Sequence, residues 1–297
     1  MQITSHAVLT SAVIALSTTS VSAFEITRVT QEGDGSVNSW VLEGDEGVVL
    51  IDAQRSLSLG REAAEAVSAT GQPLLAILLT HPHPDHFGGL QSVLDTFPGT
   101  PVYASEATTE IMATDANGFI AATKQVLGDD APDQQPLPTE IVADGQTLRF
   151  GDIELVANEI GQGEADAMTL FYAPSENALF ASDVVDNKRT AFFMEGHTTE
   201  WLAQLSEVRD TYVERDPAVY PGHGEQAGME LFDAQIEYME TFRGLVEDRL
   251  DDGVTEAETD EIVAAMEARY PNYPAVAAVP NLMRENVSAV AAEMSAE

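Results

Sequence analysis

The chain lacks cysteine, has few basic residues and carries no long apolar run beyond its N-terminus. The absence of cysteine from 297 residues excludes disulfides, thiolate zinc sites and a cysteine nucleophile. Thirteen basic against fifty acidic residues give a formal net charge of −37, which argues against nucleic acid or an anionic membrane as partner. No run of about 18 apolar residues, the length of a membrane span, occurs in the body of the chain. We therefore expect a small-molecule substrate as partner, and self-association stays an open alternative.

The first 23 residues have the pattern of a secretory signal peptide. They contain no Asp, Glu, Lys or Arg, include the apolar run 12–16 and end in Val21-Ser22-Ala23. Small residues at the end of a short apolar core are typical of a cleavage site, although the usual basic start is missing. We interpret residues 1–23 as a signal peptide and expect a periplasmic or secreted protein. A disordered cytoplasmic tail is the alternative.

A cluster of metal-ligand side chains follows the most apolar segment of the chain. Residues 74–79 are six consecutive apolar residues, which predicts a strand buried on both faces. Imidazole nitrogens and carboxylate oxygens are ligands that zinc and iron accept, and four such side chains stand in the next seven residues: His81, His83, Asp85 and His86. The spacing predicts a metal site at the end of this strand.

The remaining pattern predicts two similar halves, each with strands followed by helices. In the first half we expect three strands within 25–52, helices over 56–69, 88–97 and 105–127, and strands over 74–79 and 101–104. A loop over 128–139 precedes the second half. There we expect strands over 147–150, 153–156, 169–172, 178–181 and 218–220, and a helix over 199–213.

The last segment of the chain, residues 226–297, predicts a helical appendage. Apolar residues recur there at spacings of three and four, as in an amphipathic helix packed on the body of the protein: Phe232, Ile236, Met239, Phe242, Val246 and Leu250. Two further helices are expected over 255–268 and 281–294. The appendage either packs near the site or mediates self-association.

Three motifs together resemble the metallo-β-lactamase-fold hydrolase superfamily. They are the His81–His86 motif, Asp183 at the end of a Leu-Phe-Ala strand, and His223 in a Pro-Gly-His-Gly segment. The resemblance runs from about residue 25 to 225. It implies an α/β (α+β) fold, a four-layer αββα sandwich over residues 24–225, with the site at one edge between two sheets.

The resemblance also implies a site for two divalent metal ions, zinc first and manganese or iron as alternatives. One metal is held by His81, His83 and a third histidine, and the other by Asp85, His86 and His223, with Asp183 bridging them. Two metals can share a hydroxide of lowered pKa that attacks a carbonyl carbon. Asp85 then serves both as ligand and as catalytic hydrogen-bond partner of the attacking water.

The third histidine of that pattern is missing from this chain. The segment 161–168, where it is expected, contains no histidine, and Glu164 stands nearest to its position. A carboxylate binds zinc, manganese or iron at a similar distance, so we expect Glu164 to replace the histidine. Glu159 and Asp166 are the alternatives, and in a further alternative Glu164 only lines the pocket.

Several residues outside these motifs are candidates for supporting roles. His197 precedes the predicted helix 199–213 and could contact substrate or lie on the surface. Asp52 and Asn38 are expected to be structural. Four nearby apolar residues are expected in the core rather than in a substrate wall: Phe192, Phe193, Met194 and Trp201.

The motifs favour an exported metal-dependent hydrolase acting on an ester, lactone or amide. A β-lactamase is not specifically expected, because a fold does not define an activity. A mono-iron sulfur or thiol dioxygenase on the same fold is the second hypothesis. A non-catalytic metal-binding remnant is the third.

Overall fold

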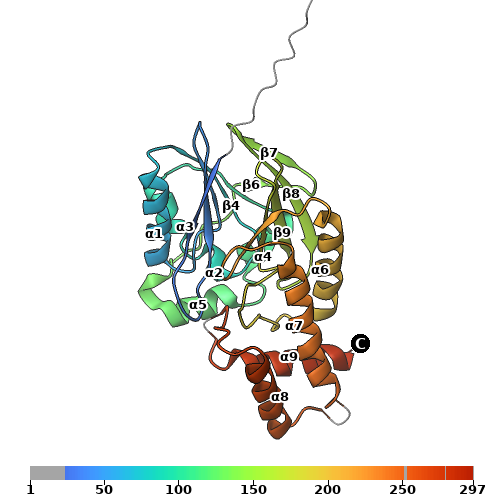
Figure 1. The fold of residues 1–297 in the computed structure, drawn as a ribbon. Helices are drawn as coiled ribbons and strands as arrows, with labels where there is room; N and C mark the ends of the chain where they lie inside the picture. Colours follow the sequence, from blue (N-terminus) through green and yellow to red (C-terminus); the bar gives the residue numbers. More distant parts are fainter. Residues whose placement is uncertain (1–23, 251–252, 278, 297) are drawn as a thin grey trace, which may run out of the picture.

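The computed structural model describes residues 24–250, 253–277 and 279–296, which form four layers (Figure 1). Two β-sheets face each other in the centre, and helices cover the outer face of each sheet. The αββα sandwich expected from the sequence is therefore confirmed. The signal peptide predicted for residues 1–23 lies outside the described residues.

The first sheet has the strand order β1-β2-β3-β4-β5-β6. The antiparallel strands β1 (Glu25–Val29), β2 (Ser39–Glu43) and β3 (Val48–Ile51) are followed by β4 (Leu74–Leu78), β5 (Val102–Ala104) and β6 (Glu140–Ile141), which run parallel to β3. Its helices are α1 (Leu57–Ala69), α2 (Pro84–Phe87), α3 (Leu90–Thr96), α4 (Glu106–Thr114) and α5 (Phe119–Leu127), and η1 (Gly128–Asp130) is a 3₁₀ turn.

The single helix predicted over 105–127 is wrong, because the chain forms α4 and α5 with a break between them. Asp115 ends α4 in the left-handed backbone region at φ 47°, and Gly118 precedes α5 at φ 70°. A right-handed helix cannot continue through such residues. The break lets α5 turn away from α4, and this turn matters for the pocket described below.

The second sheet has the order β11-β10-β9-β8-β7. Its strands are β7 (Thr147–Phe150), β8 (Ile153–Gly161), β9 (Met168–Ala173), β10 (Ala178–Ser182) and β11 (Ala218–Pro221). Strands β7 to β10 are antiparallel neighbours, whereas β10 and β11 are parallel. Helix α6 (Thr198–Tyr212) packs on the outer face.

The core consists of apolar layers that the strand period of two explains. In β3, Val49 and Ile51 contribute to the cluster between the two sheets, whereas Leu50 belongs to the cluster under α1 and α3. Both faces of β3 are therefore buried, as its unbroken apolar sequence requires.

The strand directions bring five chain segments to one edge of the sandwich. Strands β3 and β4 are parallel, as are β10 and β11, so the residues after each strand meet at the same edge. The β8–β9 connection reaches that edge as well, because β9 runs antiparallel to β10. Backbone hydrogen bonds join the halves there: Thr169 donates to Thr80 at 2.9 Å, and Asn38 donates to Gly222 at 2.7 Å.

The last helices, α7 (Glu230–Glu247), α8 (Glu256–Arg269) and α9 (Leu282–Ala296), lie at the end of the molecule beside α5 and α6 (Figure 1). Their buried residues share one cluster with those of α6, including Trp201, Phe242 and Val287. Asn286 of α9 donates from Nδ2 to the Ala191 carbonyl at 2.7 Å and accepts from the Phe193 N–H at 2.9 Å. In the described ranges no helix is both long and apolar enough to cross a membrane.

Replacing Asn286 with alanine should destabilise the whole protein. The substitution leaves two buried backbone groups without partners, at about 1–3 kcal/mol each. We expect a single unfolding transition whose urea midpoint is lower than that of the wild type. Tryptophan fluorescence and circular dichroism measure this transition. The matched control is Ser288→Ala, at an exposed position of the same helix. Equal unfolding free energies for the two variants would contradict the role of Asn286.

Candidate metal centre

Three of the predicted ligands form one compact donor group. His81 and His83 follow β4, and Glu164 lies in the β8–β9 connection. The Glu164 carboxylate is 2.9 Å from His83 Nδ1 and 3.7 Å from His81 Nε2. All three side chains are buried, and their donor atoms lie within 4.8 Å of one another. This group could hold one metal ion.

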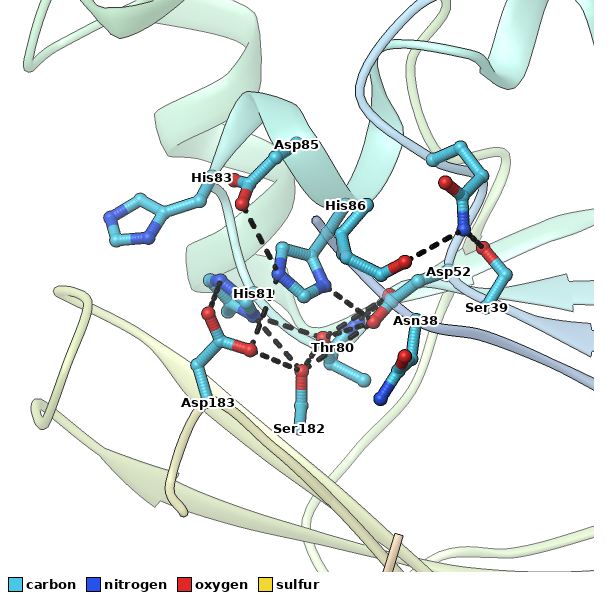
Figure 2. Close-up of polar contacts among 12 residues, drawn as sticks. Asn38, Ser39, Asp52, Thr80, His81, His83, Asp85, His86, Ser182 and Asp183 are labelled. Atoms are coloured by element: carbon cyan, nitrogen blue, oxygen red, sulfur yellow. Dashed lines mark hydrogen bonds and ion pairs between the residues drawn. The ribbon is translucent and has the colours of Figure 1, made fainter. Parts of the chain in front are cut away.

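The other four predicted ligands form a second donor group beside the first. It contains Asp85, His86, Asp183 and His223. Asp183 Oδ1 is 3.3 Å from His86 Nε2, and its Oδ2 is 3.0 Å from His223 Nε2. The same Oδ2 is also 3.8 Å from His81 Nε2 in the first group. Asp183 therefore lies between the two groups, at the position of a bridging carboxylate (Figure 2).

Each of the four histidines has its second ring nitrogen held by an oxygen atom, which leaves the other nitrogen facing the centre. His81 Nδ1 contacts Thr80 Oγ1 at 2.9 Å, and His86 Nδ1 contacts Asp52 Oδ2 at 2.8 Å. His83 Nε2 contacts Glu195 Oε1 at 2.7 Å. His223 Nδ1 contacts a backbone carbonyl, that of Ser36. Such contacts select the tautomer and orientation that a metal ligand needs.

Asp52 is the structural centre of this support. Its carboxylate accepts hydrogen bonds from the Thr80 N–H at 3.0 Å and the Thr80 hydroxyl at 2.9 Å, besides its contact with His86. Ser182 joins the network through its hydroxyl, 2.9 Å from Thr80 Oγ1 (Figure 2). Both Asp52 and Ser182 have positive φ, 57° and 45°, a strained backbone typical of functional sites.

The second donor group requires a glycine at position 222. A Cβ atom at Gly222 would overlap Oδ1 of Asp183. Asn38 holds the same turn, because its Nδ2 donates to the carbonyls of Pro221 at 2.9 Å and Gly224 at 2.8 Å. Asn38 and Asp52 therefore have structural roles, as expected from the sequence.

The donor groups fit divalent metal ions. His81 Nε2 and His86 Nε2 are buried without a hydrogen-bond partner among the described residues. Glu164 Oε2 is 2.9 Å from His83 Nδ1 but likewise makes no hydrogen bond of acceptable geometry. Such burial is unfavourable for polar atoms unless something else binds them. Two ligands at about 2.0–2.1 Å from a tetrahedral zinc ion stand roughly 3.3 Å apart. The donor separations of 2.9–3.8 Å surround that value.

Crowding of charges shifts the pKa values of the carboxyl groups in opposite directions. Burial would raise the pKa of Asp183, but His223, His86 and His81 hold that pKa well below its ordinary value. Burial raises the pKa of Glu164 to about 7, although His83 opposes the shift. Glu164 is therefore the carboxyl group of the centre that retains a proton near neutral pH when no cation is bound.

The remaining candidates lie apart from the two donor groups. Glu159 belongs to neither group and donates its backbone N–H to Asp144. Asp166 pairs instead with His197, whose Nε2 is 2.7 Å from its Oδ1. These two residues and Glu195 form a third, partly exposed group of donor atoms. Among the three acidic candidates for the missing histidine, only Glu164 reaches His81 and His83.

Glu195 is the residue that the sequence reasoning missed. Its side chain is only 5% exposed, and its Oε1 contacts His83 Nε2 at 2.7 Å. Asn117 also donates to the same oxygen at 3.2 Å. The one sequence signal is its place in the segment between Asp183 and the helix after His197, close to a predicted metal ligand.

A cavity of about 290 Å³ opens directly over the donor groups. Phe192 and Met194 line it, whereas Phe193 and Trp201 are buried in the core cluster under α6. The expectation of core packing is therefore wrong for Met194, which is 36% exposed. It is confirmed for Phe192, which is buried in a small cluster with Val276 and also lines the cavity.

The fold and these donor groups define a class of protein, the αββα sandwiches with clustered histidine and carboxylate metal-donor groups at the sheet edge. A family model described as the metallo-beta-lactamase superfamily matches residues 33–223. The chain belongs to this superfamily, as its motifs indicated.

Individual relatives are distant. The chain is 24% identical to the metallo-beta-lactamase IND-1 of Chryseobacterium indologenes over 65% of its own length and 74% of that protein. It is 28% identical to a probable hydroxyacylglutathione hydrolase of Schizosaccharomyces pombe, over 50% of this chain and 48% of the relative. The match spans less than half the length of the first three curated relatives, 28%, 48% and 48%.

Solved structures show the same fold. A metallo-beta-lactamase from Pontibacter korlensis superposes with a TM-score of 0.58 at 20% identity. The similarity covers 73% of this chain and 99% of that one. Nearly all residues without a counterpart in the superposition therefore belong to this chain rather than to the Pontibacter korlensis protein.

Removing Glu195 should weaken metal binding at the His83 side of the centre. Glu195→Ala frees His83 Nε2, and loss of such an outer contact typically lowers metal affinity about 10- to 100-fold. Chelator-competition titration with zinc should show one weakened and one unchanged site. The control, Glu214→Ala, removes an exposed glutamate and should leave both affinities unchanged. Wild-type affinity at both sites of Glu195→Ala would contradict this role.

Metal binding at the same group should weaken as the pH falls. The pKa of Glu164 is raised to about 7. Burial would lower the pKa of His83, but Glu164 and Glu195 raise it well above its ordinary value. Metal ligands must lose their protons before they bind a cation. Each proton that has to be displaced therefore lowers the apparent metal affinity about tenfold for every pH unit below the pKa of the ligand. Zinc titrations at pH 6, 7 and 8 should show this trend, and affinity independent of pH would contradict it.

Proposed function

We propose that this protein is a metal-dependent hydrolase that cleaves a carbonyl compound, an ester, lactone or amide. The single observation that carries the proposal is the convergence of two donor groups on Asp183 at the floor of a cavity. Relatives named as a hydroxyacylglutathione hydrolase and a metallo-beta-lactamase support hydrolysis as the reaction class. Because the sequence identity of these relatives to this chain is low, their names do not assign a substrate to it.

The proposed ligand sets follow the two groups. His81, His83 and Glu164 would hold one divalent cation. Asp183 would be shared with a second cation, whose other ligands would be Asp85, His86 and His223. Zinc is the first candidate, with manganese or iron as alternatives, because nitrogen and carboxylate oxygen donors suit all three. When bound, such cations polarise a carbonyl oxygen and lower the pKa of a water molecule.

Asp85 is the residue proposed to act on the attacking water. It lines the cavity, and its side chain is 23% exposed, whereas the other ligands are nearly inaccessible. Burial would raise the pKa of Asp85, but His86 and His223 hold it well below its ordinary value. An ionised carboxylate at this position accepts a hydrogen bond from water and orients its lone pair toward the substrate.

One observation favours a second function. The first donor group combines two imidazoles with one carboxylate, which is also the donor set of mono-iron oxygenases. A sulfur or thiol dioxygenase would use this group alone. The completeness of the second donor group supports the two-metal hydrolase instead.

Metal analysis with a substrate screen tests the proposal. Purified protein should contain two divalent ions per chain and hydrolyse members of a panel of esters, lactones and amides. Glu164→Ala should retain about one ion and lose at least about 100-fold in kcat/KM, since one of two positioning charges is lost. The matched control, Glu159→Ala, should behave as wild type.

Two other results would reject the proposal. One iron per chain, with oxygen consumption in the presence of thiols, would establish the dioxygenase. Full metal loading without turnover of any panel member would favour a non-catalytic metal-binding protein.

Two tightly bound ions in Glu164→Ala would remove Glu164 from the ligand set. Export of the protein stays a prediction of the sequence.

A further inference from the structure

The walls of the cavity over the donor groups are almost entirely apolar. Its floor contains His83, Asp85, Glu164 and Asp183. The walls come from α5, from the segment before His197 and from the C-terminal part of the chain: Phe119, Ala122, Val126, Leu127, Phe192, Met194, Val276, Ala277 and Val279. Among the described lining residues outside the floor, only Arg55 is charged. The chain contains fifty acidic residues, yet none of the described residues in these walls is acidic.

The apolar wall touches the donor group itself. The rings of Phe119 and Phe192 pack edge-on against the His83 ring, with centroids 5.5 and 5.2 Å away. Phe119 and Phe192 also contact each other, at 5.9 Å. An apolar substituent in this cavity would therefore lie next to the place where a carbonyl group meets the metal ligands.

The C-terminal wall is held firmly in place. Backbone hydrogen bonds join the segment 274–277 to the rest of the chain on both of its sides. The Gly35 N–H donates to the Ala275 carbonyl at 2.8 Å, and the Val276 N–H donates to the Thr190 carbonyl at 3.1 Å. Val276 is 2% exposed and clusters with Phe192. The wall is thus a fixed part of the cavity.

This wall lies outside residues 33–223, which match the family model. The matched core supplies the donor groups and α5, and the C-terminal segment closes the cavity above them. Shape and polarity of the cavity are therefore decided partly by a segment that the family pattern does not include. Such a segment can determine substrate choice without altering the metal centre.

We propose that the substrate carries an apolar acyl group, which binds between α5, Phe192 and the segment 274–277. This inference rests on the proposed carbonyl hydrolase activity. The cavity of about 290 Å³ is several times larger than the roughly 30 Å³ that one water molecule occupies in the liquid. It therefore has room for an acyl chain of medium length, and octanoyl is the test length chosen below.

A series of p-nitrophenyl esters tests this assignment on the metal-loaded enzyme. From acetate to octanoate, kcat/KM should rise up to about fourfold per methylene, as expected for burial of each CH₂ group. Beyond octanoate it should level off or fall, because the cavity is full. Turnover with kcat/KM independent of chain length, or highest for acetate, would overturn the proposal.

Variants of the C-terminal wall locate the acyl site. Ala277→Phe fills the cavity and should lower the octanoate-to-acetate ratio of kcat/KM about 15-fold, equivalent to losing two methylenes. Val276→Ser should lower it about fourfold. Val213→Ser, at a position 53% exposed on the end of α6, is the matched control and should leave the ratio unchanged. An unchanged ratio in Ala277→Phe would overturn the proposal.

A binding measurement separates this proposal from the proposed function. Calorimetry with 1-octanol on the metal-loaded protein needs no turnover. Binding to the wild type that Ala277→Phe abolishes, together with an inactive ester panel, would reject the hydrolase and retain the apolar site. Absence of octanol binding to the wild type, or equal binding to Ala277→Phe, would overturn the apolar site whatever the activity.

Discussion

The buried carboxylate of Asp52 is the constraint on which the metal centre depends. A carboxylate that is 2% exposed is stable only if hydrogen-bond donors surround it, and Thr80 and His86 supply those donors. Because the Thr80 hydroxyl also contacts His81 Nδ1, one carboxylate orients an imidazole in each donor group. Strand β3, the loop after β4 and both donor groups therefore share a single support, and this support lies away from the cavity.

The centre concentrates more negative charge than a protein interior tolerates without compensation. Asp85, Asp183 and Glu164 face four imidazoles within a buried volume. Burial raises the pKa of Glu164. Burial would lower the pKa values of His83 and His86, but the neighbouring carboxylates raise both well above the ordinary value, so protons compensate part of the charge when no cation is bound. Cations would displace those protons. The formal net charge of −37 raises the local concentration of cations and so favours this exchange.

Much of the fold and the donor set was predictable from the sequence, because the signals are local. Six consecutive apolar residues define a strand buried on both faces, and the ligands His81 to His86 follow it directly. The other candidate ligands, Asp183 and His223, each follow a short apolar strand within two residues. Parallel strands place such ends at one edge. The order of elements predicted two halves of strands followed by helices, and the resemblance carried by the three motifs implied the superfamily and the αββα layers.

The sequence by itself thus determined the strands, the family and most of the donor atoms. Only the tertiary structure showed that Glu164, rather than Glu159 or Asp166, lies beside His81 and His83. The direction of a side chain in the β8–β9 connection does not follow from the spacing of residues in the sequence. The tertiary structure also joined Glu195 to His83 across 112 positions, a pairing that no local pattern encodes. Finally, packing decided that a C-terminal segment outside the family core closes the cavity, since contacts between distant segments arise only when the layers assemble.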